Sequence, residues 1–344
     1  MSDYLVTGSQ LTNIASAIRS KNGESSLYTV DEMPSKILAI AGGGGITPTG
    51  TYSISSNGVY NIYNYASVDV NVPDDIYLLK KDNLLTTYTS DDTTVEQGAF
   101  GATISLTSVS FSQATSIHQY AFIRCMSLVS TYFPLVKGTI GSSAFAFCFK
   151  LSSASFSLVT SVGANAFEYC SALTSLSFPE LTYAAAYAFR GCQYLTALSL
   201  PKVTTVSTQA FSGCSRIKTV DLPKCTTVGV GGFSLCRSVT SYSLPLVKSV
   251  YSNAFYSNYS ISSLTLPSCT MLSAYAFRYC SSLMNLYLPG SSIPVLTATA
   301  FANMPFSVSV GGVFGSIHVP SSMLASYKAS TNWATYSNRI VAIE

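Results

Sequence analysis

The chain has 344 residues, only 10% of them charged, and a formal net charge of +3. This charge is too weak and too dispersed to indicate a nucleic-acid interface, which needs clustered lysine and arginine. Hydrophobic residues make up 48% of the chain, but the longest apolar runs are short, such as residues 144–149, whereas a membrane-spanning helix needs about 20. We therefore expect no membrane insertion, and a core that is built from many small portions.

Residues 1–42 are predicted to form a two-helix docking module. Ser9 is a suitable N-cap for a first helix that ends at Asn22–Gly23, and a second helix is expected to begin near Asp31. Two helices of about ten residues cannot bury a core alone. Their apolar faces are therefore expected to dock on another protein or on copies of the chain. The docking residues would be Leu11, Ile14, Ile18, Ile37 and Leu38.

Residues 43–75 are predicted to contain a flexible joint and a small β-hairpin module. The glycine run, assigned to a linker at 43–46, lacks the Lys-Ser/Thr of a phosphate-binding loop and is typical of a flexible joint. Apolar residues alternate over residues 47–75, and Asn57–Gly58 is a typical hairpin turn. Residues 76–93 are interpreted as a linker into the next region.

Residues 94–316 contain a repeat of about 22 residues. A phenylalanine recurs at almost constant spacing, an apolar or small residue lies five positions before it, and an L-x-x-L-x-L-P phrase follows it. Because these three features recur with the same period, they indicate repeated structural units. The repeat phenylalanines are Phe100, Phe122, Phe145, Phe167, Phe189, Phe211, Phe233, Phe255, Phe277 and Phe301.

Each unit is predicted to be one coil of a solenoid. The last two leucines of the phrase are two residues apart, which is strand alternation, and the proline ends the strand. The V-x-x-x-x-F half of the unit leads the chain back to the start of the next strand, and its valine and phenylalanine add two side chains that point inward. A single coil buries almost nothing, whereas stacked coils bury a continuous core. We therefore expect a solenoid of about ten coils with short parallel strands.

The cysteines follow the same period, three residues after the repeat phenylalanine. Equivalent positions in neighbouring coils have parallel Cβ vectors about 4.8 Å apart, whereas a disulfide requires convergent Cβ atoms nearer 3.8 Å. Zinc sites usually begin with a C-x-x-C pair, which is absent. A ladder of buried thiols is the favoured interpretation, and disulfides are the alternative. The residues in this position are Cys125, Cys148, Cys170, Cys192, Cys214, Cys236 and Cys280, with Asn258 in the remaining coil.

Residues 317–344 are predicted to cap the end of the solenoid, where the core would otherwise meet water. A last strand is expected at residues 317–320, followed by a short helix that Ser321 or Ser322 could cap. Trp333 would then cover the final coil, and His318 would be a structural residue.

The unit A-F-x-x-C-x-x-L-x-x-L-x-L-P resembles the BspA-type leucine-rich repeat over residues 94 to about 301. The resemblance implies a leucine-rich-repeat solenoid, and such repeats are known mainly from surface adhesins. The phrases Leu11–Lys21, Asp31–Met33 and Asn57–Ile62 resemble the N-terminal module of structural proteins in phages and prophages of gut Firmicutes. Residues 1–8 show no secretory signal, and no wall-sorting or membrane anchor is expected at the C-terminus.

Catalysis is not expected. The two histidines, His118 and His318, are about 200 residues apart in the chain, and no nucleophile, carboxylate-pair or metal-binding motif is present. We therefore expect no cofactor and no metal.

A binding surface is expected on outward side chains of the coils. Tyrosine offers a large contact area at a low entropic cost and can stack on sugars or protein, and Arg190 and Arg278, in one position four coils apart, could contact anions. The candidate residues are Tyr132, Tyr169, Tyr187, Arg190, Tyr194, Asp221, Tyr256, Tyr259, Tyr275, Arg278, Tyr279, Asn285 and Tyr287.

Together with the two resemblances, these features favour a virion adhesin that is made in the host cytoplasm. Residues 1–42 would bind other virion proteins, and the solenoid would bind a protein or glycan of the host cell surface. A homo-oligomer is possible, since several copies would add avidity. The alternatives are a BspA-like adhesin of the bacterial cell surface and a structural decoration protein of the virion.

Overall fold

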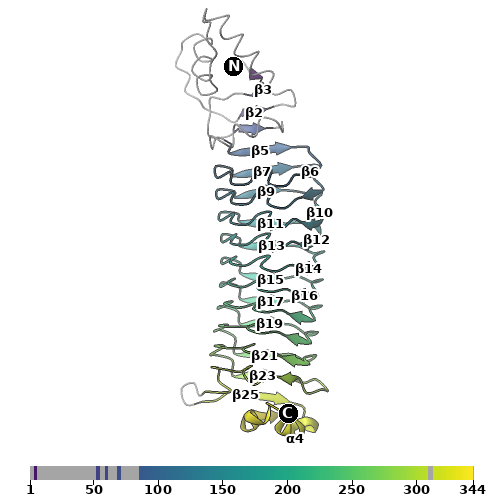
Figure 1. Ribbon diagram of the computed structural model, residues 1–344, viewed down its shortest axis with the longest axis vertical. Coiled ribbons are helices and arrows are strands. Elements are labelled where there is room, and N and C mark those ends of the chain that lie inside the picture. Colours follow the sequence, from purple (N-terminus) through teal and green to yellow (C-terminus); the bar gives the residue numbers. More distant parts are fainter. Residues whose placement is uncertain are drawn as a thin grey trace, which may run out of the picture.

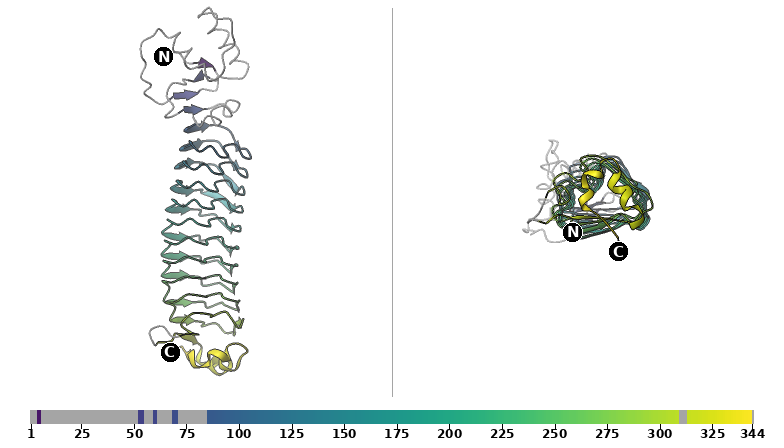
Figure 2. Two further views of the ribbon diagram at one scale, coloured as in Figure 1. Left: turned by 60° about the vertical axis from the view of Figure 1, so that its left-hand side comes forward. Right: turned by 90° about the horizontal axis from the view of Figure 1, so that it is seen from below.

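The computed structural model describes residues 85–308 and 313–343, together with the backbone of four short strands nearer the N-terminus. The described coils stack into an elongated body with a helical cap at its C-terminal end (Figure 1). Seen along the long axis, successive coils superimpose, and the cap lies across the end of the stack (Figure 2). The prediction of a leucine-rich-repeat solenoid with short parallel strands is confirmed.

The L-x-x-L-x-L phrase forms short parallel strands along one side of the solenoid, as predicted; they are hydrogen-bonded in four successive sheets and are here called the first strand ladder. The middle residue of a strand points into the core and its neighbours point outward, as at Leu198 between exposed Ala197 and Ser199. The ladder contains β5 (Thr87–Ser90), β7 (Ser108–Phe111), β9 (Ser130–Tyr132), β11 (Ser153–Ser155), β13 (Ser175–Ser177), β15 (Ala197–Ser199), β17 (Thr219–Asp221), β19 (Ser241–Ser243), β21 (Ser263–Thr265), β23 (Asn285–Tyr287), β25 (Ser316–Val319) and β26 (Ile340–Ala342).

A second parallel ladder, a single ten-stranded sheet, forms where the sequence indicated only a return of the chain. Most of its strands have two residues, of which the second is buried, as in Thr205–Val206. The ladder contains β6 (Thr94–Val95), β8 (Ser116–Ile117), β10 (Lys137–Ile140), β12 (Leu158–Val162), β14 (Tyr183–Ala184), β16 (Thr205–Val206), β18 (Thr227–Val228), β20 (Ser249–Val250), β22 (Met271–Leu272) and β24 (Val295–Leu296).

The repeat phenylalanines form a continuous column through the core. The rings of Phe189 and Phe211 are 5.2 Å apart and tilted by only 3°, and the same stacking recurs from Phe100 to Phe301. A second aromatic column, Phe111, Phe133, Phe156 and Phe178, packs beside it in the first coils. Leucine takes this position from Leu200 onward. Offset-stacked and edge-to-face aromatic pairs add stability beyond their buried area.

The A-F-x-x-C segment forms the third side of each coil, here called the turn side. The residues two before and two after the repeat phenylalanine have positive φ in most coils, for example Tyr187 at 61° and Gly191 at 74° around Phe189. Alternate amides donate within their own coil and to the next one: Arg190 N donates to Tyr187 O, and Gly191 N donates to Ser212 O. The turn side is thus a third ladder of hydrogen bonds between coils.

All nine cysteines are buried, and none forms a disulfide. In the predicted ladder, each thiol donates to the carbonyl of the repeat phenylalanine in the preceding coil, as Cys192 Sγ does to Phe167 O at 3.2 Å. Burial raises the pKa of the Cys214 and Cys280 thiols to about 12. The buried-thiol interpretation is confirmed, and the disulfide alternative is wrong.

The described stack begins before residue 94. Strand β5 pairs in register with β7, and Leu85 and Tyr88 are buried in the core. Part of the segment interpreted as a linker, residues 76–93, is therefore the first coil of the solenoid, because its alternating apolar side chains cover the next coil.

Four short strands lie nearer the N-terminus: β1 (Tyr4–Leu5), β2 (Tyr52–Ile54), β3 (Val59–Tyr60) and β4 (Val68–Val70). Strand β2 pairs in parallel with β4, and β3 pairs antiparallel with β1. The predicted hairpin turn at Asn57–Gly58 lies outside the described residues. The two predicted helices, with Leu11, Ile14, Ile18, Ile37 and Leu38, and the glycine linker lie outside the described residues.

The C-terminal cap contains η2 (Ser321–Met323), α4 (Leu324–Ala329) and η3 (Ala334–Arg339), between β25 and β26. Trp333 covers the last repeat phenylalanine, Phe301, as predicted, and its Nε1 donates to Pro294 O at 2.8 Å. Neither Ser321 nor Ser322 caps a helix through its side chain, since Pro320 occupies the N-cap position.

Candidate functional site

The two histidines occupy separate structural settings. His118 lies 3.6 Å from the Glu96 carboxylate on the surface. The His318 ring stacks on Tyr287 with ring centroids 4.2 Å apart, and burial lowers its pKa. Within residues 85–308 and 313–343, no group of histidine, cysteine and acidic side chains is arranged to hold a metal ion. In the same residues, no helix has the length and apolar content to cross a membrane.

Four of the predicted surface residues lie on the first strand ladder. Tyr132 is 57% exposed at the end of β9, and Asp221 is exposed at the end of β17. Asn285 and Tyr287 lie on β23, where Asn285 Oδ1 is 3.0 Å from His318 Nε2 and Tyr287 stacks on the same ring. The structure therefore brings Asn285 and Tyr287 together with His318, while Tyr132 and Asp221 lie on separate coils.

Arg190, Tyr169 and Tyr187 form one cluster on the turn side. The guanidinium lies over both rings, 5.6 Å from the Tyr169 centroid and 5.5 Å from that of Tyr187. Its Nη1 also donates to Glu168 Oε1 at 3.4 Å, and Glu168 accepts a second hydrogen bond from Asn165. The neighbouring coil thus already supplies a carboxylate for Arg190, which we had expected to contact an external anion.

A second cluster, four coils further on, contains Arg278, Tyr275 and Tyr279. The Arg278 guanidinium is 5.0 Å from the Tyr275 ring centroid and 4.8 Å from the Tyr279 ring centroid. Arg278 Nη2 also donates to the Tyr279 hydroxyl at 3.2 Å. Tyr256 packs edge-on against Tyr279 at 5.6 Å. Within the described residues, Arg278 forms no salt bridge with a carboxylate. This cluster is therefore held together by cation–π contacts, which are worth about 0.5–1 kcal/mol each at exposed sites.

The remaining two predicted tyrosines pair with arginines that sequence reasoning did not single out. Arg216 lies over Tyr194, 3.9 Å from the ring centroid. Arg237 lies over Tyr259 at 5.9 Å, and the Tyr259 hydroxyl donates to Ser257 Oγ. Both tyrosines are more than 40% exposed, so each pair presents an aromatic and cationic contact to solvent.

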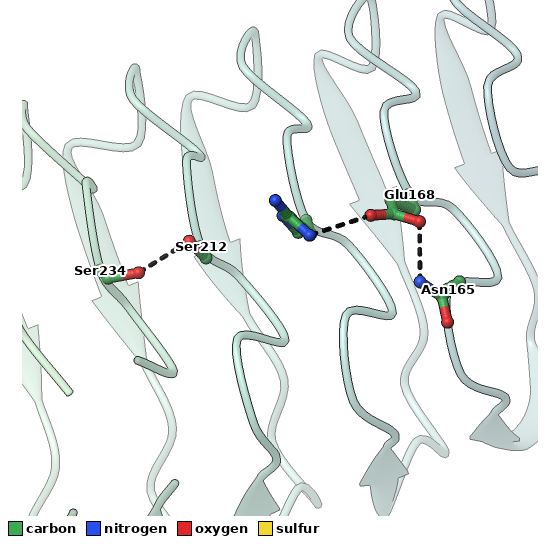
Figure 3. A network of polar contacts seen from close by, with 5 residues as sticks. Asn165, Glu168, Ser212 and Ser234 are labelled. Atoms are coloured by element: carbon green, nitrogen blue, oxygen red, sulfur yellow. Dashed lines mark hydrogen bonds and ion pairs between the residues drawn. The ribbon is translucent and has the colours of Figure 1, made fainter. Parts of the chain in front are cut away.

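An open groove of about 460 Å³ lies on the turn side between the two clusters. It follows two columns of residues, those one and two positions after the repeat phenylalanine, here called the +1 and +2 columns. Ser212 and Ser234 lie in the +1 column, and their hydroxyls share a 2.7 Å hydrogen bond (Figure 3). The groove is lined by Tyr169, Arg190, Gly191, Gln193, Gln209, Ser212, Gly213, Val230, Gly231, Ser234, Leu235, Asn253 and Tyr256.

Sequence reasoning identified three of these residues, Tyr169, Arg190 and Tyr256, but missed the groove between them. The signal is visible when the coils are aligned. Over successive coils the +1 column reads Glu168, Arg190, Ser212, Ser234, Tyr256 and Arg278, and the +2 column reads Tyr169, Gly191, Gly213, Leu235, Ser257 and Tyr279. Both columns are small in one coil, at Ser212 and Gly213, and one column is small in the coil on either side, at Gly191 and Ser234. This pattern indicates a depression.

Comparison with known proteins agrees with this architecture. Among solved structures, a leucine-rich repeat protein from Bacteroides ovatus ATCC 8483 is similar, with a TM-score of 0.52 and 18% identity over 80% of this chain and 70% of that chain. A leucine rich cell surface protein from Faecalibacterium prausnitzii A2-165 has a TM-score of 0.37 and 18% identity over 84% of this chain and 89% of that chain. A leucine rich repeat protein from T. pallidum has a TM-score of 0.39 and 25% identity over 56% of this chain and 90% of that chain.

At these levels of identity, the Bacteroides structure supports the fold alone. No protein of curated function matches the sequence. The BspA type leucine rich repeat region, by contrast, matches residues 93–218 and 182–307, which together span more than half of the chain. The chain therefore belongs to the BspA-type leucine-rich repeat family.

Proposed function

We propose that this protein is an adhesin-type binding protein of the bacterial cell surface, and that the turn side of its solenoid holds the partner. The observation that carries the proposal is the row of tyrosine and arginine side chains on that side, from Tyr169 and Arg190 to Arg278 and Tyr279. Membership of the BspA-type family supports the same class of function.

The hydrogen bonding of the coils supports recognition through side chains. Backbone amides on the turn side donate to neighbouring coils, as Gly213 N does to Ser234 O and Leu235 N does to Tyr256 O. These groups are therefore not available to pair with an added strand, which is a common way to bind peptides. Tyrosine and arginine are the side chains most often found at binding hot spots.

Binding of the labelled full chain to bacterial and epithelial cells tests the proposal. Replacing Tyr275 and Tyr279 with alanine is expected to reduce binding by more than about 10-fold, as for other hot-spot tyrosines. The matched control is Tyr183→Ala, which removes an exposed tyrosine from β14 on another side of the solenoid. Equal losses in the two variants, or no binding by the unaltered chain, would contradict the proposal.

A virion-associated receptor-binding protein is the second candidate. It is supported by the phrases in residues 1–75 that resemble modules of phage structural proteins. The same solenoid surface would then contact a host bacterium. Mass spectrometry of purified virions, together with antibody labelling of intact producing cells, separates the two candidates. Label on cells that yield no virions supports the bacterial surface, whereas recovery only in virions supports the phage. Virions that lack the solenoid and still adsorb normally would indicate a decoration protein.

A further inference from the structure

The groove is open where Gly213 lacks a side chain, because a Cβ there would have no neighbour nearer than 3.7 Å. Gly191, one coil earlier, lies against the Tyr169 ring, whose other neighbour is the stacked ring of Phe147 at 5.5 Å. Leu235, one coil later in the +2 column, carries a large side chain. In the +1 column, Ser212 and Ser234 lie between Arg190 and Tyr256. The depression therefore runs along the stack, with an aromatic ring at each end and two serine hydroxyls at its floor.

The groove is close to electrically neutral. Arg190 is its only charged lining residue, and its charge is balanced by Glu168, whose side chain is buried and is held by Asn165 Nδ2 at 2.7 Å (Figure 3). A phosphate or carboxylate ligand would have to compete with this carboxylate for the guanidinium. The arrangement thus disfavours an anionic ligand.

Its hydrogen-bonding groups are ones that both donate and accept. The hydroxyls of Ser212 and Ser234 and the side-chain amides of Gln193, Gln209 and Asn253 all line the groove, and each carries both functions. A ligand that is rich in hydroxyl groups complements such a set. A peptide strand does not, because Gly191 N and Gly213 N already donate to the next coil.

From these observations we infer that the groove binds a neutral oligosaccharide, with a sugar ring against Tyr256 and sugar hydroxyls on the serine and amide side chains. This inference specifies a ligand class for the binding function proposed above, and it rests on that function. The combination of aromatic surfaces with a few placed polar groups is the usual composition of small-ligand sites.

Gly213→Tyr is the sharpest variant for testing the groove. A Cβ at Gly213 would have no neighbour nearer than 3.7 Å, and its φ of 76° lies in the left-handed region. Tyr169 and Tyr279 occupy the same column with φ of 56° and 61°, so the coil accommodates a tyrosine there. The matched control is Ala102→Tyr, in the +2 column of an early coil, where Ala102 is exposed with φ of 59°.

The labelled full chain, Gly213→Tyr, Tyr256→Ala and Ala102→Tyr are applied to an array of neutral and acidic oligosaccharides and of peptides. We expect binding to neutral oligosaccharides, reduced at least about 10-fold in Gly213→Tyr and Tyr256→Ala and unchanged in Ala102→Tyr. Because no charge is shared with the ligand, binding should change little between about 0.05 and about 0.5 M NaCl. Binding to peptides or acidic sugars only, no binding at all, or equal binding by Gly213→Tyr would overturn the inference.

Cell binding by the same variants distinguishes this inference from the proposed function. If Gly213→Tyr binds cells as well as the unaltered chain does, the groove assignment fails while the adhesin function stands. If the unaltered chain binds the array but no cells, the adhesin function fails and the oligosaccharide site stands.

Discussion

Asn258 shows how one residue exchange is balanced by another within the repeat. It replaces the ladder cysteine, and its Nδ2 donates to Phe233 O at 2.8 Å, as a thiol does in the other coils. Its Oδ1 also accepts a hydrogen bond from the buried Tyr242 hydroxyl at 2.5 Å. Tyr242 itself occupies a position where Val220 and Leu264 are found in the neighbouring coils. The two buried polar side chains, Asn258 and Tyr242, therefore supply hydrogen-bond partners to each other.

Asn258→Cys is expected to destabilise the protein by about 1–3 kcal/mol, because it leaves the Tyr242 hydroxyl buried without its acceptor. Adding Tyr242→Leu removes that hydroxyl, so the double variant should be more stable than the sum of the two single effects. Denaturant unfolding of the three variants measures this coupling. Strictly additive free energies would contradict the pairing.

The cysteine ladder is expected to be unreactive while the protein is folded. Burial raises the thiol pKa values, to about 12 at Cys214 and Cys280, and the thiolate is the nucleophile. At pH 8, which is below these values, the thiols are protonated, and a disulfide reagent should not label them. In guanidinium chloride all nine cysteines should react, which provides the control. Rapid labelling of the native protein would show that the ladder is accessible.

At the scale of the elements, the C-terminal cap closes the phenylalanine column. Phe301 meets the Trp333 ring at 5.9 Å and the Tyr336 ring at 5.2 Å, and Tyr327 packs edge-on against Trp333 at 5.1 Å. All four rings are buried. Without this cover, the last coil would expose its core to water, as in any repeat protein without a terminal cap.

Trp333→Ala is expected to cost about 3–5 kcal/mol, the usual range for a buried aromatic residue. Trp333→Phe should cost less, since it keeps a ring against Phe301 and loses the hydrogen bond to Pro294 together with a smaller part of the buried ring volume. Amide hydrogen exchange measures the effect locally. We expect faster exchange in β24, β25 and β26 of the alanine variant and little change near β5. Uniform acceleration along the whole chain would argue against a local capping role.

Some elements could be predicted from the sequence because the stack places equal residues at equal positions. The phenylalanine column and the cysteine ladder are of this kind. The second strand ladder could not be predicted, because two-residue strands such as Thr205–Val206 have no alternation to detect. Nor could the left-handed turn positions, because Tyr187 and Gln209 occupy them instead of glycine. The groove depends on small residues such as Ser212, Gly213 and Ser234, which form no motif within one coil and stand out only when the coils are aligned.

At the scale of the whole molecule, contacts are made chiefly between adjacent coils. Successive repeat phenylalanines stack on each other, and the strands of the ten-stranded sheet pair with their counterparts in neighbouring coils. The stability of such a chain is approximately a sum of coil and interface contributions. The number of coils can therefore change without altering the fold of the others.

Deleting residues 204–225 should leave a folded solenoid that is one coil shorter. The deletion joins Val203 to Thr226 and keeps the pattern Pro-Lys-Val-Thr-Thr-Val across the junction. Circular dichroism should keep its native shape, and the denaturant dependence of unfolding should fall in proportion to the lost surface. A deletion of 204–214 is the control, because it breaks the period and should unfold the neighbouring coils. If the variant that lacks residues 204–225 has no fixed tertiary structure, the coils are not interchangeable.

The stacking of short coils also determines how the molecule would respond to tension. If the chain is pulled at its two ends, we expect its coils to unfold one after another, beginning at the less stable end. Each coil that opens adds roughly 70 Å of slack, because its 22 residues extend by at most about 3.3–3.6 Å each. Optical tweezers should therefore record a sawtooth of small, evenly spaced steps instead of one rupture. A stack of this kind therefore extends gradually under load, and the peak force stays low.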